Sequence, residues 1–400
     1  MDNIQLENTE PVLEKKKLTS QKKLQLWLKN NLFKDWKNAI LTIVTLMFTI
    51  YLLVNIGGFL VASEWSVVTD NLRLLFVGQF PIEEIWRLWV SILFLSVLLG
   101  TSWGVWRGII GHVAISLGAL LLVFGILPYT EIESKVYLFS SVVAIGVFYF
   151  VGKYVPKLKI PMLVLWILYI PICLSIINGF GVLEPVKTNI WGGFLLTLII
   201  ASVSIICSFP LGLLLAVGRR SKLPIIKYCC ILYIELIRGM PLIMVLFIAQ
   251  LLLPMFLLGG IQLDNVVRAM IAFTLFSAAY LAENIRGGLQ SIPRGQFEAA
   301  QALGLNNIKM MVFVVLPQAL KAVIPAMVGQ FISVFKDTSL VAVIGLADFL
   351  GMGKKIAANP EYLGKYMELY IVIAFIYFIF CFLMSHVSKH IEKSLGVGTR

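Results

Sequence analysis

Long apolar runs restrict what this chain can fold into more than any other feature. Stretches of about 20 apolar residues recur along the sequence, and this is the length that crosses roughly 30 Å of hydrocarbon as an α-helix. Charged residues make up only 14% of the chain, whereas a soluble domain has about 25%. The sequence therefore predicts an all-α integral membrane protein with about ten transmembrane helices.

The apolar runs define the predicted spans and their order. They lie at 39–62, 86–106, 109–127, 136–151, 160–179, 192–217, 232–257, 265–287, 318–344 and 366–386. The fourth run is short. The ninth carries polar residues, and we expect it to be broken or partly re-entrant.

The net charge of +12 is unevenly distributed. The cations gather in clusters: Lys15, Lys16, Lys17, Lys22, Lys23, Lys29, Lys34 and Lys37; Lys153, Lys157 and Lys159; Arg219, Arg220, Lys222 and Lys227; and Lys389, Lys393 and Arg400. Loops rich in Lys and Arg stay cytoplasmic. All the clusters fall on the cytoplasmic side if the N-terminus is inside, so both termini are predicted to be cytoplasmic. This distribution favours a lipid bilayer, and not nucleic acid, as the partner of the charges.

Tryptophan usage divides the chain into two halves. All nine Trp lie at or before Trp191, and several flank predicted spans, as interface anchors do. The predicted domains are a cytoplasmic basic tail (1–37), an N-terminal transmembrane extension of about five helices (38–180), an external linker (181–191) and a working half (192–395). The tail is predicted to contain an amphipathic helix near 24–36, and the extension to lie outside the substrate path.

A polar, helix-forming loop at 288–317 interrupts the working half. Pro293 suits the first turn of a helix, where its missing N–H costs nothing. Residues 296–303 are strong helix formers. Gly304 suits the left-handed residue that ends a helix.

A second helix should follow at once. Asn306 can cap a helix over 307–315, and Pro317 marks where that helix meets the next span. On physical grounds the loop is either a solvated cap on two spans or a helix that inserts into a groove on a soluble motor protein.

The residues of this loop resemble those of a known family. The pattern is similar to the EAA loop of ABC importer permeases, and it is carried by Glu298, Ala299, Ala300, Gly304, Val314, Leu316 and Pro317. The segments IELIRGMPL (234–242), AYLAENIRGGLQSIPRGQFEAAQALG (279–304) and LPQALKAVIPAMVGQFISVFKDTSLVAVIG (316–345) look like the polar amino acid uptake subfamily, which takes in histidine, glutamate and glutamine permeases. EWSVVTDNLRLLFVGQFP (64–81) resembles the M-type permease of general L-amino acid transporters.

The resemblance implies a fold and a set of partners. It implies a MetI-like core of five helices in 192–395, paired with a second permease chain, sister or identical, in a bacterial inner membrane. It also implies two cytoplasmic ATPase subunits, which bind ATP and Mg, and a periplasmic amino-acid-binding protein. The residues that would couple to the ATPases are Glu298, Ala299, Ala300, Gly304, Leu316 and Pro317.

The chain itself carries no sign of ATP hydrolysis. It contains no G-x-x-x-x-G-K-[ST] sequence, so it should not bind ATP by a P-loop. No Ser/His/Asp or Cys/His set suggests covalent catalysis. We therefore expect a transport subunit with no catalytic residue and no cofactor of its own.

Charged residues inside the spans are costly and usually face a cavity or a partner. Glu235 and Arg238 are three residues apart on a helix, as are Glu283 and Arg286, so each couple is predicted to pair. The helix that carries Glu235 should break at 239–241, where Gly and Pro occur.

Polar residues also mark a candidate translocation path. An amino acid offers one ammonium and one carboxylate, so its path needs weak sites of both signs. The candidates are Gln330, Ser333, Lys336, Asp337, Glu283 and Asn284. For Lys336 and Asp337 a hinge or a dimer contact is an equal alternative.

Metal binding and disulfides are not expected. His386 and His390 have the i,i+4 spacing of a zinc helix, but no third ligand lies near them in the sequence. The five Cys have no framework spacing and are expected to be buried free thiols.

Two other functions are compatible with the spans. One is a secondary transporter driven by a proton or sodium gradient through Glu235 or Glu283, and the other is a scaffold or receptor component without a transport path. The loop at 288–317 discriminates, because a secondary transporter has no need of a helix that docks on an ATPase.

Overall fold

The computed structural model describes residues 20–127, 132–256 and 263–396. Over these ranges the chain is helical, with isolated bridges but no strand. Among the described residues, nine helices are long and apolar enough to cross a membrane, or ten if a bent pair counts as one span. Of the predicted basic clusters, Lys15, Lys16, Lys17 and Arg400 lie outside the described residues.

The chain divides into two units, Met1–Glu64 and Trp65–Arg400. The first contains α1 (Ser20–Asn31) and α2 (Trp36–Ala62). The predicted amphipathic helix near 24–36 thus ends at Asn31, because the chain turns before α2 begins. No residue of α2 is buried, which suits a helix whose apolar side chains face lipid.

The second unit begins with the rest of the N-terminal extension. Its helices are α3 (Ser66–Thr69), α4 (Leu72–Val77), α5 (Trp86–Trp106), α6 (Ile109–Ile126), α7 (Ile132–Tyr154) and α8 (Lys159–Asn178), with 3-10 turns η1 (Ile82–Glu84) and η2 (Pro156–Leu158). Glycines let α5 approach α7 closely. A Cβ on Gly104 would lie 2.2 Å from the carbonyl oxygen of Tyr149.

The remaining elements form the core. They are η3 (Thr188–Ile190), α9 (Gly193–Gly218), α10 (Pro224–Arg238), α11 (Leu242–Leu251), α12 (Leu253–Phe256), α13 (Asn265–Ser291), α14 (Arg294–Ala302), α15 (Asn307–Met310), the π-helix η5 (Met311–Val315), α16 (Leu316–Asp337), η6 (Thr338–Ile344), α17 (Phe349–Ala357), η7 (Pro360–Tyr362) and α18 (Tyr366–Leu395). Glycines again set the packing distances. A Cβ on Gly212 of α9 would lie 2.8 Å from Cβ of Leu281 in α13.

The sequence predicts a break in two of the spans, the seventh and the ninth. The seventh consists of α10 and α11, bent by 107° at 239–241, which confirms the break expected from Gly and Pro there. In the ninth span, 318–344, α16 continues through Pro325, but the regular α-helix ends at Asp337 and residues 338–344 form the 3-10 helix η6. A proline interrupts one helical hydrogen bond, and neighbouring helices can hold the turn together.

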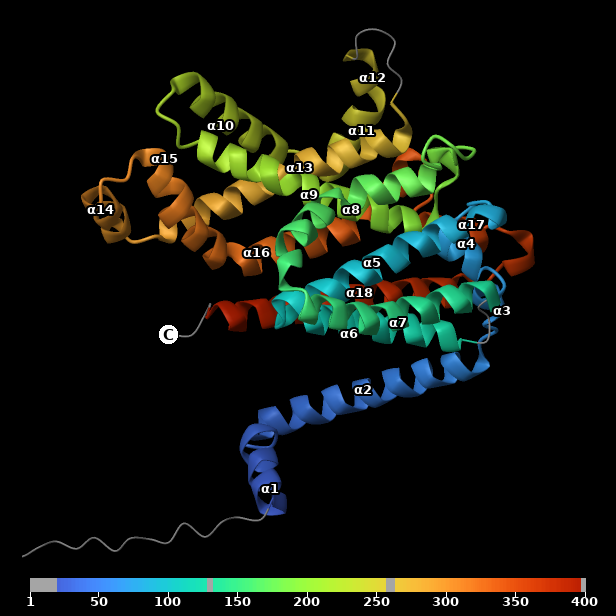
Figure 1. The fold of residues 1–400 in the computed structure, drawn as a ribbon. Helices are drawn as coiled ribbons and strands as arrows, with labels where there is room; N and C mark the ends of the chain where they lie inside the picture. Colours follow the sequence, from blue (N-terminus) through green and yellow to red (C-terminus); the bar gives the residue numbers. More distant parts are fainter. Residues whose placement is uncertain (1–19, 128–131, 257–262, 397–400) are drawn as a thin grey trace, which may run out of the picture. The chain divides into compact units, whose positions relative to one another are not determined.

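The ends of the second unit carry different elements (Figure 1). The helices α14 and α15 lie at the same end as the C-terminus of α18, whereas α3, α4 and α17 lie at the opposite end. This arrangement agrees with the alternation of spans that the sequence predicts, in which 288–317 and the C-terminus share one side of the membrane.

Candidate functional site

The EAA loop, residues 288–317, is built from capped turns. Pro293 is the residue before α14 and not in its first turn. Gly304 has φ +74°, the left-handed conformation predicted for it. Open space surrounds the position a Cβ would take there, so backbone conformation and not crowding favours glycine.

The second half of the loop starts with a cap and ends in a wider helix. The Oδ1 of Asn306 accepts a hydrogen bond of 2.8 Å from the backbone N–H of Lys309, as predicted. Only 307–310 is α-helical, and 311–315 forms a π-helix that leads into α16. The amide of Gln318 donates to Gln296 Oε1 at 3.0 Å, which ties α16 back to α14.

One face of the EAA loop is anchored. Ala300 is 2% exposed and packs in a cluster of buried residues with Met310, Val315 and Ala319. Leu316 is half-buried against the same cluster. Of the predicted coupling residues, Ala300 therefore holds α14 in place rather than facing outward.

The rest of the EAA loop is largely exposed and includes large apolar side chains. Glu298, Ala299, Gly304 and Pro317 are exposed. In the same loop Leu303, Ile308 and Phe313 are 81%, 75% and 71% exposed. Sequence reasoning missed these three side chains, although large apolar residues in a polar loop were a visible signal. Exposed apolar side chains on a helical turn are typical of a protein–protein interface.

A second site lies where α9, α10 and α13 meet. It consists of five charged side chains, here termed the charged cluster: Arg219, Glu235, Arg238, Glu283 and Arg286. The predicted pair Glu283–Arg286 is confirmed, with Arg286 Nε 2.9 Å from both carboxylate oxygens. The predicted pair Glu235–Arg238 is wrong.

The actual partners of Glu235 and Arg238 come from other helices. Arg219 Nη2 lies 3.1 Å from Glu235 Oε1, and Arg219 Nη1 lies 3.3 Å from Glu283 Oε2. Arg238 Nη1 lies 3.8 Å from Glu283 Oε2. Packing of α10 against α9 and α13 brings these groups together, which local spacing along α10 could not indicate.

The charged cluster has three guanidinium groups for two carboxylates. Arg238 lies over the ring of Tyr280 at 5.6 Å, and its buried Nε has no hydrogen-bond partner among the described residues. Arg238 is also the last residue before the bend between α10 and α11. A surplus guanidinium at a broken helix can bind a carboxylate, since discontinuous helices commonly form transporter substrate sites.

The other path candidates lie outside this cluster. Gln330, Ser333 and Asp337 are half-buried on α16, and Lys336 is exposed. The Gln330 amide and the Ser333 hydroxyl have no hydrogen-bond partner within the described part of the chain. Asn284 is half-buried on α13, next to Glu283.

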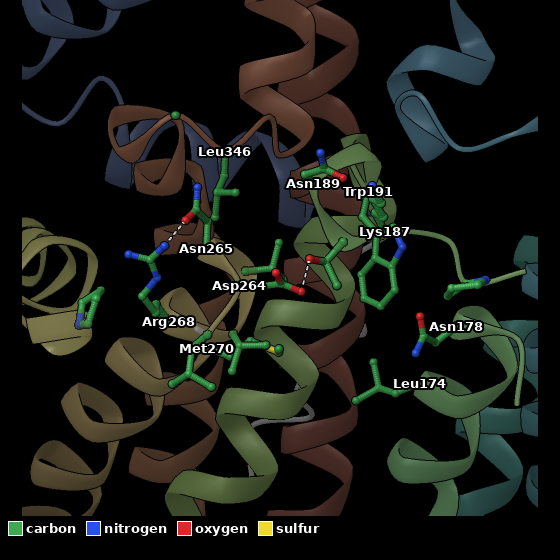
Figure 2. A pocket seen from close by; sticks show the side chains of 17 residues that line it. Leu174, Asn178, Lys187, Asn189, Trp191, Asp264, Asn265, Arg268, Met270 and Leu346 are labelled. Atoms are coloured by element: carbon green, nitrogen blue, oxygen red, sulfur yellow. Dashed lines mark hydrogen bonds between the residues drawn. The ribbon is translucent and has the colours of Figure 1, made fainter. Parts of the chain in front are cut away.

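A pocket of about 1080 Å³ opens between the end of α8, the linker and the start of α13. Figure 2 shows Arg268 and Asn265 on one side of it and Lys187, Trp191 and Asn178 on the other. Asp264 lies between them and accepts a hydrogen bond of 2.8 Å from the Thr188 hydroxyl. The predicted linker thus lines a pocket with charges of both signs.

Asp348 is a buried residue that sequence reasoning missed. Its carboxylate accepts hydrogen bonds from the backbone N–H of Gly351 at 2.9 Å and of Leu350 at 3.3 Å, which caps α17. The hydroxyl of Tyr377 also donates to it, at 3.4 Å. Burial raises the pKa of Asp348 to about 6. An Asp just before an apolar run was the available signal of a cap.

The three histidines of the chain meet, although the sequence suggested no third one near His386 and His390. The His112 ring on α6 lies 4.7 Å from the His390 ring, which lies 4.4 Å from that of His386. The rings are tilted against one another, and the described ranges contain no His, Cys, Asp or Glu group arranged to hold a metal ion.

Comparisons with known proteins agree on one kind of protein. Residues 208–397 match the family described as binding-protein-dependent transport system inner membrane component. The chain is 36% identical to the inner membrane amino-acid ABC transporter permease protein YhdY of Escherichia coli, over 93% of both chains. It is 35% identical to the glutamate/glutamine/aspartate/asparagine transport system permease protein BztC of Rhodobacter capsulatus, over 92% of this chain and 93% of that one.

Shorter relatives match about half of the chain. The probable glutamine ABC transporter permease protein GlnP of Bacillus subtilis is 36% identical over 51% of this chain and 92% of its own length. A crystal structure of an amino acid ABC transporter with histidines shares 33% identity, covers 50% of this chain and 92% of that chain, and has a TM-score of 0.46.

Proposed function

Since the chain belongs to the amino-acid ABC transporter permeases, we propose that it is the permease subunit of an ATP-driven importer of L-amino acids. The observation that carries the proposal is the EAA loop, with one face packed in the core and the other exposing Leu303, Ile308 and Phe313. A rigid apolar surface of this kind suits docking on a cytoplasmic ATPase.

The proposed assembly follows from this role. A second permease chain, sister or identical, completes the translocation path, and two ATPase subunits bind ATP and Mg. An amino-acid-binding protein delivers substrate to the external side, where the pocket lined by Asp264, Arg268 and Lys187 would receive it.

Within the chain, we assign the path to the charged cluster and the polar face of α16. The surplus guanidinium of the cluster offers a site for the carboxylate of the amino acid. The Gln330 amide can donate to a carboxylate and accept from an ammonium, without the insertion cost of a full charge.

The Gln330 assignment has a direct test. Gln330→Leu keeps the size and apolarity of the span but removes both hydrogen-bonding functions. We expect amino-acid flux to fall while assembly and basal ATP hydrolysis stay unchanged, measured as uptake and ATPase rates of the reconstituted complex. Unaltered uptake would move Gln330 to a structural role.

The alternative function is a secondary transporter that uses Glu235 or Glu283. In the charged cluster both carboxylates are already paired with guanidinium groups, whereas a carboxylate that carries a coupled ion must exchange partners in each cycle. The pairing therefore favours the ATP-driven importer.

Reconstitution in liposomes separates the two functions. The importer should take up radiolabelled amino acids only when both permease chains, the ATPases, internal ATP and the external binding protein are present, and ionophores should not stop it. Uptake by this chain alone under a proton or sodium gradient would overturn the proposal.

A further inference from the structure

The first unit exposes an unusual concentration of aromatic side chains near one end of α2. Trp27 on α1 is 55% exposed, Phe33 in the turn is 48% exposed and Trp36 at the start of α2 is 70% exposed. Tryptophan with one apolar and one polar edge is favoured at the boundary between lipid and water. The exposure of these rings indicates that this end of the unit meets such a boundary.

The same segment is strongly basic. Residues 20–37 contain five lysines and a single acidic residue, Asp35. Lys22 and Lys29 are exposed and seven residues apart, so they share one face of α1. None of the ion pairs among the described residues involves a lysine of this segment.

Trp27 and two of the lysines occupy different faces of α1. Trp27 lies roughly opposite Lys22 and Lys29 around a helix of about 3.6 residues per turn. Basic residues on one face and Trp or Leu on the other are typical of a helix that lies in the plane of the membrane surface.

The turn keeps α1 beside the membrane. Four residues, 32–35, separate α1 from the 27-residue span α2, and fully extended they reach only about 14 Å. The turn is also held in place, because the Thr42 hydroxyl donates to the carbonyl oxygen of Leu32 at 2.8 Å. A helix tied so closely to a span stays within reach of the lipid headgroups.

We propose that α1 and the turn to α2 form an interfacial anchor that binds the headgroups of anionic phospholipids. Trp27, Phe33 and Trp36 enter the boundary region, and Lys22, Lys29, Lys34 and Lys37 contact the phosphates and other anionic groups. Lys37 already lies over the Trp36 ring, at 5.8 Å, which places a cation beside an interfacial aromatic. The proposal is independent of the transported substrate.

Brominated lipids test the proposal on the full chain in vesicles. Subtracting the emission of a Trp27→Phe variant from the emission of the natural chain gives the contribution of Trp27 alone. Brominated phosphatidylglycerol should quench this emission more than brominated phosphatidylcholine at the same mole fraction, because lysines attract anionic headgroups to the surroundings of α1. High salt should reduce the difference.

Charge variants identify the lysines responsible. In K22Q/K29Q/K34Q/K37Q the ratio of the two quenching efficiencies should fall to about one, since the attraction of each lysine is lost. The variant with arginine at the same four positions should keep the preference. The matched control K153Q/K157Q/K159Q/K389Q removes four exposed lysines elsewhere and should also keep it.

Three outcomes would overturn the proposal. Absence of quenching by either lipid would place Trp27 away from the membrane, for instance on a soluble protein. Equal quenching by both lipids in the natural chain would leave an apolar anchor without anionic recognition. If K22Q/K29Q/K34Q/K37Q keeps the preference for the anionic lipid, residues other than these four lysines are responsible for it.

Discussion

The left-handed conformation of Gly304 is what allows α14 to end and the chain to turn into α15. Replacement by a β-branched residue would cost roughly 1–2 kcal/mol in this conformation. We expect Gly304→Val to change the angle between α14 and α15 and to lower ATPase association and stimulated turnover, with normal membrane insertion.

Gly295 offers a matched control for this substitution. It lies in the same loop and also has open space around its Cβ position, but it has no positive φ. Gly295→Val should therefore leave coupling largely intact. Full coupling in Gly304→Val, measured as transport per ATP hydrolysed, would refute the role of the turn.

At the residue scale, the raised pKa of Asp348 predicts that the stability of the chain depends on pH. Its folded pKa of about 6 lies above the ordinary value of 3.8, so its contribution to stability is full below about 3.8 and is lost as the pH rises through about 6. The whole shift corresponds to on the order of 3 kcal/mol. The natural chain should thus gain stability relative to Asp348→Asn as the pH falls from 7.5 to about 4.5.

Thermal unfolding of both chains in detergent across this pH range measures the effect. Asp348→Asn keeps a capping oxygen for α17 but cannot ionise. Asp70→Asn, at an exposed position, is the control and should follow the natural chain. A constant difference between the natural chain and Asp348→Asn would contradict the assignment.

At the scale of elements, the two carboxylates of the charged cluster contribute unequally to holding α9, α10 and α13 together. Glu283 is 22% exposed and contacts three arginines, whereas Glu235 is 55% exposed and contacts one. Glu283→Gln should cost about 1–3 kcal/mol, because it leaves partly buried guanidinium groups unpaired. Glu235→Gln should cost less than about 1 kcal/mol, since solvent screens an exposed pair.

Unfolding of the two variants under identical conditions compares these contributions. Arg219 contacts both carboxylates, so each single variant leaves it one partner and the double variant leaves it none. The double variant should therefore lose more than the sum of the single losses. If Glu235→Gln loses as much stability as Glu283→Gln or more, solvent exposure does not determine how much each carboxylate contributes to the cluster.

At the scale of the whole molecule, the extension and the core are expected to differ in contact with water. Glycines pack α5 against α7, and the shorter relatives match only about half of this chain. A cysteine-accessibility scan in a background without the five native Cys should find few reactive mid-membrane positions in α5 to α8. More should lie between 192 and 345, and a continuous reactive stripe along α5 or α8 would contradict this.

The sequence by itself determined the spans, the bend at 239–241, the left-handed Gly304 and the Asn306 cap. Each depends on interactions between residues a few positions apart: apolar length, the missing N–H of proline, the missing Cβ of glycine, a side chain that bonds the next turn. Such features can be predicted from neighbouring residues alone.

Only the tertiary structure decided which distant groups meet. It paired Glu235 with Arg219 and not Arg238, brought His112 to His390, buried Asp348 beneath Tyr377 and kept α16 continuous through Pro325. It also turned Ala300 inward and left Leu303, Ile308 and Phe313 outside. These outcomes depend on how separate helices pack, and helices far apart in the sequence can pack in many ways that local spacing does not distinguish.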